Sequence, residues 1–142
     1  MVDLLVIKIG TECFGIETAY VKAVTKNLIW PDHEHYPDFA SDIVEYEGRK
    51  VVVVDLGMKT EKCRWSDFIV VSCKDGEFVM PIDAVIDIFQ VSEKDIILIP
   101  VFAEKNMSEN FFKGVFSRGN TLVLLLDVSK LLQRGIHAGS GL

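Results

Sequence analysis

Cysteine is scarce in this chain, and its few cysteines show no metal-binding pattern. Cys13, Cys63 and Cys73 are odd in number, and no two of them form a Cys-x-x-Cys pair. The sequence therefore indicates neither a disulfide framework nor a zinc knuckle, because both need paired or closely spaced thiols. We expect Cys13 and Cys73 to act as small buried hydrophobic residues.

Basic clusters and long apolar segments are also missing. The 142 residues include 21 acidic and 15 basic ones, for a net charge of −6, and the Lys and Arg are scattered. Because no basic stripe could follow a phosphate backbone, we expect no nucleic-acid partner. The apolar run in residues 1–10, MVDLLVIKIG, is too short and too soon interrupted for a signal peptide or a membrane span. We therefore expect a cytoplasmic protein without membrane insertion.

Catalytic motifs are absent as well. The phosphate-binding patterns G-x-x-x-x-G-K-[ST] and G-x-G-x-x-G do not occur, and neither does a G-x-S-x-G elbow. Asp127 ends the apolar run TLVLLLD, where a magnesium ligand would lie, but Asp55 ends the similar run VVVVD. A feature that is built twice without a phosphate loop indicates architecture, so we expect Asp127 to be a turn residue or a helix N-terminal residue whose carboxylate accepts backbone N–H groups. The sequence predicts no enzymatic activity and no cofactor.

One short segment, DHEH at 32–35, has the residue types of a metal site. His33 and His35 would share one face of a strand, with carboxylates on both sides as oxygen ligands. The alternative is a solvated acidic loop, which lacks the rigid surroundings that a metal site needs. We favour the loop, and a small-ligand or metal-sensing β-barrel stays as an alternative function.

Strand-forming sequence is abundant. Hydrophobic residues make up 49% and charged residues 25%, which is ordinary for a folded domain, and the length favours one compact unit. Runs of β-branched and apolar residues are separated by turn sequences at 47–49, 74–77 and 117–120. Only DVSKLLQRG, residues 127–135, has a helical pattern. The predicted fold class is mainly β with a short C-terminal helix.

The apolar pattern of the first half recurs in the second. An offset of 64 residues aligns LLVIKI (4–9) with FIVVSC (68–73), Phe14 with Phe78, Ile16 with Met80, Val21 with Val85, and Val24 with Ile88. A mainly β repeat of this size is too small to be stable alone. We therefore expect two barrel-like subdomains, at about residues 1–66 and 67–135, that share one core.

Two apolar segments, YVKAV at 20–24 and DAVIDIF at 83–89, allow two interpretations. Their periodicity favours burial in the core. Alternatively, they expose apolar side chains at a seam between the subdomains, where a partner helix or strand edge would dock.

Four segments resemble, in this order, the CheW-like domain of bacterial chemotaxis: FGIETAYVKAV, EGRKVVVVDL, FVMPIDAVIDIF and FFKGVFSRGNTLVLLLDVSKLL. The resemblance spans almost the whole chain, whose length resembles the standalone coupling proteins of the family. It implies one domain over 1–142, built from two five-stranded, SH3-like β-barrels. It also implies a non-catalytic adaptor that links a CheA-type histidine kinase to the cytoplasmic tips of chemoreceptors.

The same resemblance implies partner-binding residues. Val21 and Val24 fall on the segment that lines the receptor groove in the family. Asp83 and Val85 fall on the family's Val-Asp-x-Val segment in the second half.

One motif departs from the family. Where the family usually reads Gly-Val-Ile-Asn-Leu-Arg-Gly, this chain reads DIVEYEG at 42–48, and Val52 replaces a usual proline. Gly48 is kept, but Glu45 and Glu47 replace the Asn and the Arg, which reverses the charge and removes a planar hydrogen-bonding fork. We expect Glu45, Glu47 and Gly48 to lie in the partner surface and receptor coupling to be altered.

Overall fold

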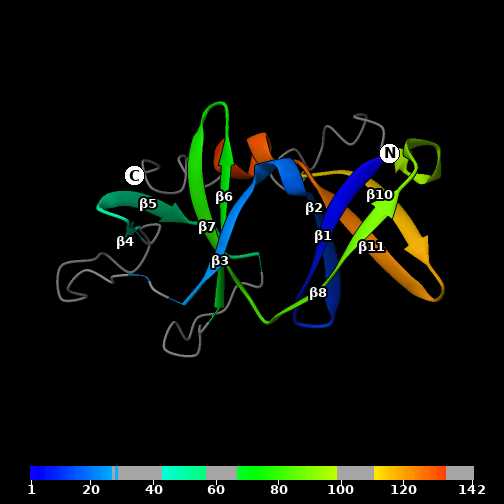
Figure 1. Ribbon diagram of the computed structural model, residues 1–142, viewed down its shortest axis with the longest axis horizontal. Coiled ribbons are helices and arrows are strands. Elements are labelled where there is room, and N and C mark those ends of the chain that lie inside the picture. The colour runs from blue at the N-terminus through cyan, green and yellow to red at the C-terminus, as the bar shows by residue number, and fades with distance from the viewer. Residues whose placement is uncertain (27, 29–42, 57–66, 99–110, 134–142) are drawn as a thin grey trace, which may run out of the picture.

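In the computed structural model the chain forms two β-sheets that lie against a common core (Figure 1). The structure describes residues 1–26, 28, 43–56, 67–98 and 111–133. The predicted class is confirmed, since the described residues are mostly strand and a short helix occupies residues 128–133. None of the helical segments in this described part has the length and apolar character needed to cross a lipid bilayer.

Among the described residues, the first sheet has six strands and the second has five. In order of pairing, the first sheet consists of β8 (Ala84–Val91), β1 (Val2–Ile9), β2 (Glu12–Glu17), β11 (Thr121–Leu126), β10 (Phe112–Arg118) and β9 (Ile97–Leu98). The second consists of β3 (Val21–Thr25), β6 (Asp67–Cys73), β7 (Gly76–Ile82), β5 (Arg49–Val53) and β4 (Ile43–Tyr46). Short 3₁₀-helices, η1 (Thr18–Tyr20) and η4 (Glu93–Asp95), precede β3 and β9. Within the described residues, the first sheet has one short strand beyond the five expected per barrel, because β9 pairs with β10.

The sheets do not follow the predicted division near residue 66. β1 and β2 pair with β8 and β11 from the second half of the chain, whereas β6 and β7 pair with β3 and β5 from the first half. Each sheet therefore combines the leading hairpin of one repeat with later strands of the other. The reason is that a hairpin leaves both of its outer edges unpaired, and strands of the opposite repeat satisfy these backbone groups.

The pairing registers repeat with the offset seen in the sequence. Ile7 of β1 lies opposite Val85 of β8, and Val71 of β6 lies opposite Val21 of β3, so each residue is 64 positions from its counterpart. The repeat in the sequence is therefore also a repeat of strand pairing. It relates β1, β2 and β8 to β6, β7 and β3.

The parallel pairings extend this equivalence to the remaining hairpins. Phe14 of β2 lies opposite Leu124 of β11, and Phe78 of β7 lies opposite Val52 of β5. The hairpins β10–β11 and β4–β5 are therefore equivalent. Arg118 pairs with Thr121 in one and Tyr46 pairs with Arg49 in the other, so the turns at 119–120 and 47–48 match as well.

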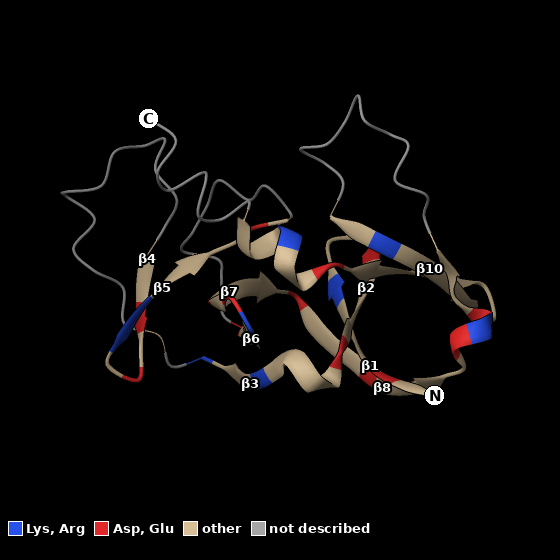
Figure 2. Cartoon of the chain, turned by 90° about the horizontal axis from the view of Figure 1, so that it is seen from above, with Lys and Arg blue, Asp and Glu red and all other residues tan. Residues whose placement is uncertain are grey.

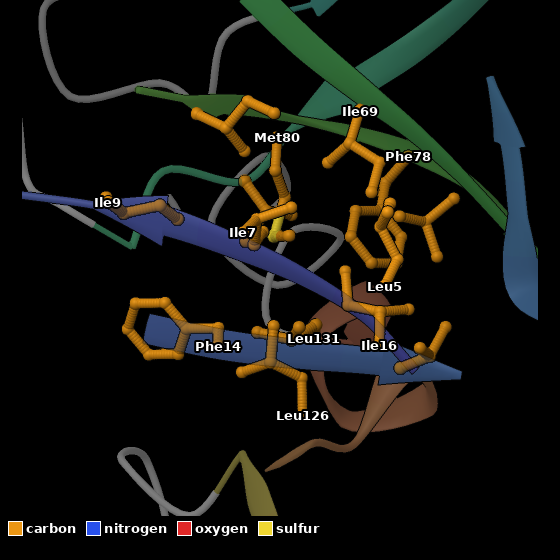
Figure 3. Packing of buried hydrophobic residues seen from close by; sticks show 14 of the residues in the cluster. Leu5, Ile7, Ile9, Phe14, Ile16, Ile69, Phe78, Met80, Leu126 and Leu131 are labelled. Carbon is orange, nitrogen blue, oxygen red and sulfur yellow. The ribbon is translucent and has the colours of Figure 1, made fainter. Parts of the chain in front are cut away.

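The buried apolar side chains of the described residues form three cores. The shared core lies between the sheets and the C-terminal helix and contains Leu5, Ile7, Ile9, Phe14, Ile16, Val54, Ile69, Val71, Phe78, Met80, Ile82, Leu126, Val128, Leu131 and Leu132 (Figure 3). The first sheet encloses the first interior core: Leu4, Val6, Val91, Phe116, Val123 and Leu125. The second sheet encloses the second interior core: Val44, Tyr46, Val51, Val53, Val70 and Val79. The predicted common core is thus present, and each sheet has an interior of its own.

The continuous apolar runs are explained by strands that are buried on both faces. In β1, Leu5 and Ile7 enter the shared core, whereas the alternating Leu4 and Val6 enter the first interior core. Successive side chains of a strand point to opposite faces, so a strand between two cores needs apolar residues at every position.

The C-terminal helix begins as predicted. The backbone N–H of Lys130 donates a hydrogen bond to Oδ1 of Asp127 at 3.2 Å, so this carboxylate caps the first turn. The helix then places Val128, Leu131 and Leu132 in the shared core. Asp127 therefore serves the helix start, as the sequence indicates.

The prediction that Cys13 and Cys73 are buried is wrong. Both residues are half-buried, because each lies close to a turn, at 10–11 and 74–75, where the sheet ends. Cys13 still packs against the first interior core and Cys73 against the shared core. Cys63 lies outside the described residues.

Candidate partner-binding surfaces

Apolar side chains are exposed on two edge strands, β3 and β8. Val24 of β3 is 47% exposed, and on β8 Val85, Ile86 and Ile88 are 44%, 48% and 57% exposed. The core interpretation of the two segments is therefore wrong for these residues. Each strand pairs on one side only within the described chain, β3 with β6 and β8 with β1, so its other side is left for solvent or a partner.

Both edge strands carry the same irregularity. The register between β8 and β1 passes over Ile86, and the register between β3 and β6 passes over Lys22. An unpaired extra residue of this kind is a β-bulge, which bends a strand and redirects a side chain. The two bulges are equivalent in the repeat, but one carries an apolar side chain and the other a cation.

Val21 and Val24 both lie on β3 but have different environments. Val21 is half-buried and packs against the shared core, whereas Val24 is exposed. Val24 is therefore the residue of this pair that exposes apolar surface.

Asp83 and Val85 lie at the start of β8 and differ in role. The backbone N–H of Asp83 donates to the Lys8 carbonyl at 2.9 Å, and the Asp83 carboxylate accepts a hydrogen bond from the backbone N–H of Gly10. Asp83 therefore ties the start of β8 to the turn between β1 and β2. Val85 is exposed and belongs to the apolar edge.

Glu45, Glu47 and Gly48 lie on the β4–β5 hairpin, at the edge of the second sheet opposite to β3. Glu45 is exposed and pairs in register with Lys50 of β5. The turn residues Glu47 and Gly48 have φ values of 48° and 77°. A type I′ turn needs positive φ at both positions, which is costly for a residue with a Cβ such as Glu47.

A charged cluster, which sequence reasoning missed, links β3 to this hairpin through β7. Glu77 of β7 accepts hydrogen bonds from Arg49 Nη2 of β5 at 2.7 Å and from Lys22 Nζ of β3 at 3.3 Å. Both cations also lie over the ring of Tyr46 of β4, at 5.7 Å for Arg49 and 5.9 Å for Lys22. We call Lys22, Tyr46, Arg49 and Glu77 the Glu77 cluster.

The pKa values within the Glu77 cluster reflect these contacts. Burial acts to raise the pKa of Glu77, but hydrogen bonds from Arg49 and Lys22 outweigh it, and the pKa is lowered. The hydrogen bond to Glu77 raises the pKa of Arg49. A hydrogen bond with Glu47, followed by burial, raises the pKa of Tyr46. At neutral pH the cluster therefore contains one carboxylate between two cations.

The two exposed edge strands, β3 and β8, differ in the sign of their charged residues. Figure 2 shows Lys and Arg on β3 and β5, and acidic residues beside β8. On β8 the acidic residue is Asp87, whose carboxylate accepts a hydrogen bond from the backbone N–H of Ile88 at 2.8 Å. A partner that covers both edges would meet cations on one and apolar side chains with a carboxylate on the other.

The metal-site alternative is not tested by the structure. The described residues contain no group of His, Cys, Asp and Glu arranged to hold a metal ion. The segment DHEH at 32–35 lies outside the described residues. The alternative stays a prediction from the sequence.

Comparison with known proteins places this arrangement in a family. The family model described as the CheW-like domain matches residues 3–135. The chain belongs to the CheW-like domain family. A structure search matches the scaffolding protein TtCheW from Thermoanaerobacter tengcongensis, with 20% identity, a TM-score of 0.69 and coverage of 88% of each chain. At this identity the match shows a common fold. The comparison with curated proteins found no match.

In this CheW-like domain, the altered β4–β5 hairpin carries its positive charge at a different position. The resemblance implies an Arg at the position of Glu47, and the sequence alone indicates that its positive charge is lost. The structure places Arg49 two residues further along, on β5, with Nη1 4.0 Å from the Glu47 carboxylate. A guanidinium therefore remains at the hairpin, attached to the other strand.

Proposed function

We propose that this chain is a non-catalytic scaffold of bacterial chemotaxis that binds a CheA-type histidine kinase. Membership of the CheW-like family over 3–135 supports the scaffold role. We infer the binding surface from the exposed edge of β8, where Val85, Ile86 and Ile88 lie on one strand. Apolar side chains grouped on a strand edge favour burial against another protein.

Catalysis is not part of the proposal. The sequence contains no complete set of nucleophile, base and orienting residue. The Glu77 carboxylate is paired with two cations and adjoins the apolar second interior core. These groups support a binding surface better than a reaction centre.

Calorimetric titration against the regulatory domain of a cognate CheA-type kinase tests the proposal. We expect Ile88→Ser to weaken binding roughly tenfold, since it removes about 1–2 kcal/mol of apolar burial. Leu122→Ser is the matched control, because Leu122 of β11 is 58% exposed, close to the 57% of Ile88, but lies on a different strand. Equal losses for both variants, or no binding by the unmodified chain, would contradict the proposal.

Salt dependence separates apolar docking from charge steering. We expect the kinase affinity to change little between low and high salt, because burial of apolar surface is not screened by ions. A steep loss of affinity at high salt would assign the interaction to charge instead.

We further propose that the chain contacts the cytoplasmic tip of a chemoreceptor through β3 and the β4–β5 hairpin, with altered preference. Glu45 and Glu47 would face the receptor where the family usually has Asn and Arg. Restoring the family's Asn and Arg with Glu45→Asn and Glu47→Arg should strengthen binding to a standard receptor hairpin fragment by about 1–3 kcal/mol if the charge of the two glutamates is what opposes binding.

The control for this exchange is Glu45→Asn alone, because Glu47→Arg also places a second guanidinium beside Arg49. Equal affinities of the unmodified and doubly substituted chains, measured by titration, would show that these glutamates do not control receptor choice. A divergent paralogue without receptor coupling would then be the better description.

A further inference from the structure

Glu77 occupies an unusual place for a carboxylate. It lies two residues before Val79 on β7 and therefore points to the same side of the strand as that member of the second interior core. Its side chain is 16% exposed. A carboxylate with so little exposure needs cationic or hydrogen-bonding partners to offset the loss of hydration.

The two partners use different oxygens of the carboxylate. Arg49 donates from Nε at 3.2 Å and from Nη2 at 2.7 Å, and both bonds end on Oε1 of Glu77. Lys22 donates to Oε2 at 3.3 Å. An amide at this position would offer one oxygen and one NH2 group, so it would satisfy one cation and repel the other.

The partners also come from opposite edges of the second sheet. Lys22 lies on the edge strand β3, and Arg49 lies on β5 beside the other edge strand, β4. Tyr46 of β4 lies beneath both cations. The Glu77 cluster thus spans the interior of the sheet and connects its two edges at one end.

The fold itself does not require this cluster. In the first sheet, the residue equivalent to Glu77 is Cys13, and the residue equivalent to Lys22 is Ile86, in the same strand pairing and at the same bulge. That sheet therefore forms with a thiol and an apolar side chain at these two positions. The charged version is a feature of the second sheet alone.

We propose that Glu77 is a positioning residue that holds the β3 edge and the β4–β5 hairpin in one fixed arrangement. This inference rests on the proposed function for its consequence: Val24 of β3 and the turn at 47–48 then form one surface toward a receptor fragment. Glu77 acts through Lys22 and Arg49, and the partner does not touch it. The β8 edge, which we assign to the kinase, lies on the other sheet and is independent of this connection.

The test compares Glu77→Gln with Glu17→Gln. Glu17 of β2 accepts a hydrogen bond from Lys113 of β10 at 2.9 Å, so the control removes a similar ion pair from the first sheet. Amide hydrogen exchange of β3 and of residues 43–53 reports their fixation directly. We expect Glu77→Gln to speed exchange there by roughly tenfold and Glu17→Gln to leave it unchanged.

Binding measurements with the same variants give the functional part. We expect Glu77→Gln to weaken the binding of a receptor hairpin fragment by about three- to tenfold and to leave the kinase affinity unchanged. On acidification the receptor affinity of the unmodified chain should fall relative to that of Glu77→Gln, because only the unmodified chain loses the charge of Glu77, whereas Glu45 and Glu47 are present in both. A merely packed residue would not produce this difference in pH profile.

The outcomes separate the two proposals. Unchanged hydrogen exchange in Glu77→Gln would overturn the positioning role, whatever the binding data. Faster exchange with unchanged receptor affinity would overturn its consequence for the partner surface. If the unmodified chain binds neither partner, the proposed function fails, and the exchange data still decide the role of Glu77.

Discussion

The two sheets are built on one plan but fill their equivalent positions differently. Both use the same strand order around a leading hairpin, the same offset in register and the same bulge on an edge strand. At the bulge, however, the first sheet has Ile86 and the second has Lys22. The positively charged hairpin residue Arg49 of the second sheet is equivalent to the uncharged Thr121 of the first.

This difference shows which positions the fold constrains. The residues that enter the shared core keep their character in both repeats, as Phe14 and Phe78 do, because the common interior excludes water. Positions on the edges and turns have changed in charge and size. Since those positions do not pack in the shared core, they are free to specialise for different partners.

The largest effect is expected from truncating either of the two equivalent phenylalanines in the shared core. Phe78→Ala and Phe14→Ala should each lower the free energy of unfolding by about 3–5 kcal/mol, through lost burial and the cavity left behind. Urea denaturation measures both. A loss of less than about 1 kcal/mol for Phe14→Ala would show that the two repeats do not contribute alike.

A second comparison concerns the starts of β7 and β2. Gly76 has a φ of 148°, and a Cβ there would lie 3.1 Å from Leu132 Cδ2 of the C-terminal helix. Gly76→Ala should therefore cost about 1–3 kcal/mol through backbone strain and crowding. Glu12→Ala, at the equivalent exposed position, should change stability by less than about 0.5 kcal/mol. Thermal unfolding of both variants would contradict this account if the two were equally stable.

The Glu77 cluster should add a pH dependence to stability that Glu77→Gln lacks. The pKa of Glu77 is lowered in the folded chain, so its contribution is present above the unfolded pKa of about 4.3 and is lost as pH falls through the folded pKa. We expect the unmodified chain to lose about 1 kcal/mol more than Glu77→Gln as the solution is acidified below that unfolded value. Denaturant unfolding at several pH values measures this, and parallel curves would refute it.

The smallest effect is expected at the two equivalent hairpin turns. Glu47 has a φ of 48°, whereas the corresponding residue of the β10–β11 turn is Gly119, with a φ of 60°. Glu47→Gly should gain about 0.5 kcal/mol by removing a strained Cβ, although it also removes the hydrogen bond between Glu47 and Tyr46. Gly119→Glu should lose a similar amount in thermal unfolding. A loss in both variants would show that the Tyr46 contact outweighs the backbone strain.

Local patterns in the sequence predicted much of the architecture. The runs that form β1 and β6 were evident because strands between two cores are apolar at every position. Gly48 and Gly119 marked two turns, and Asp127 marked the helix start, since these residues act on their own backbone neighbourhood. The offset between Phe14 and Phe78 disclosed the repeat.

The sequence also determined the kind of protein, through the order of its family-like segments, and it located the altered hairpin at Glu45 and Glu47. Tertiary structure decided which strands pair, because unpaired hairpin edges can be satisfied by either half of the chain. It decided that Ile88 is exposed, since apolar periodicity does not say whether another element covers a strand. It alone joined Lys22, Arg49 and Glu77, because an ion pair between strands depends on how a sheet curls, and no spacing along the chain encodes that curvature.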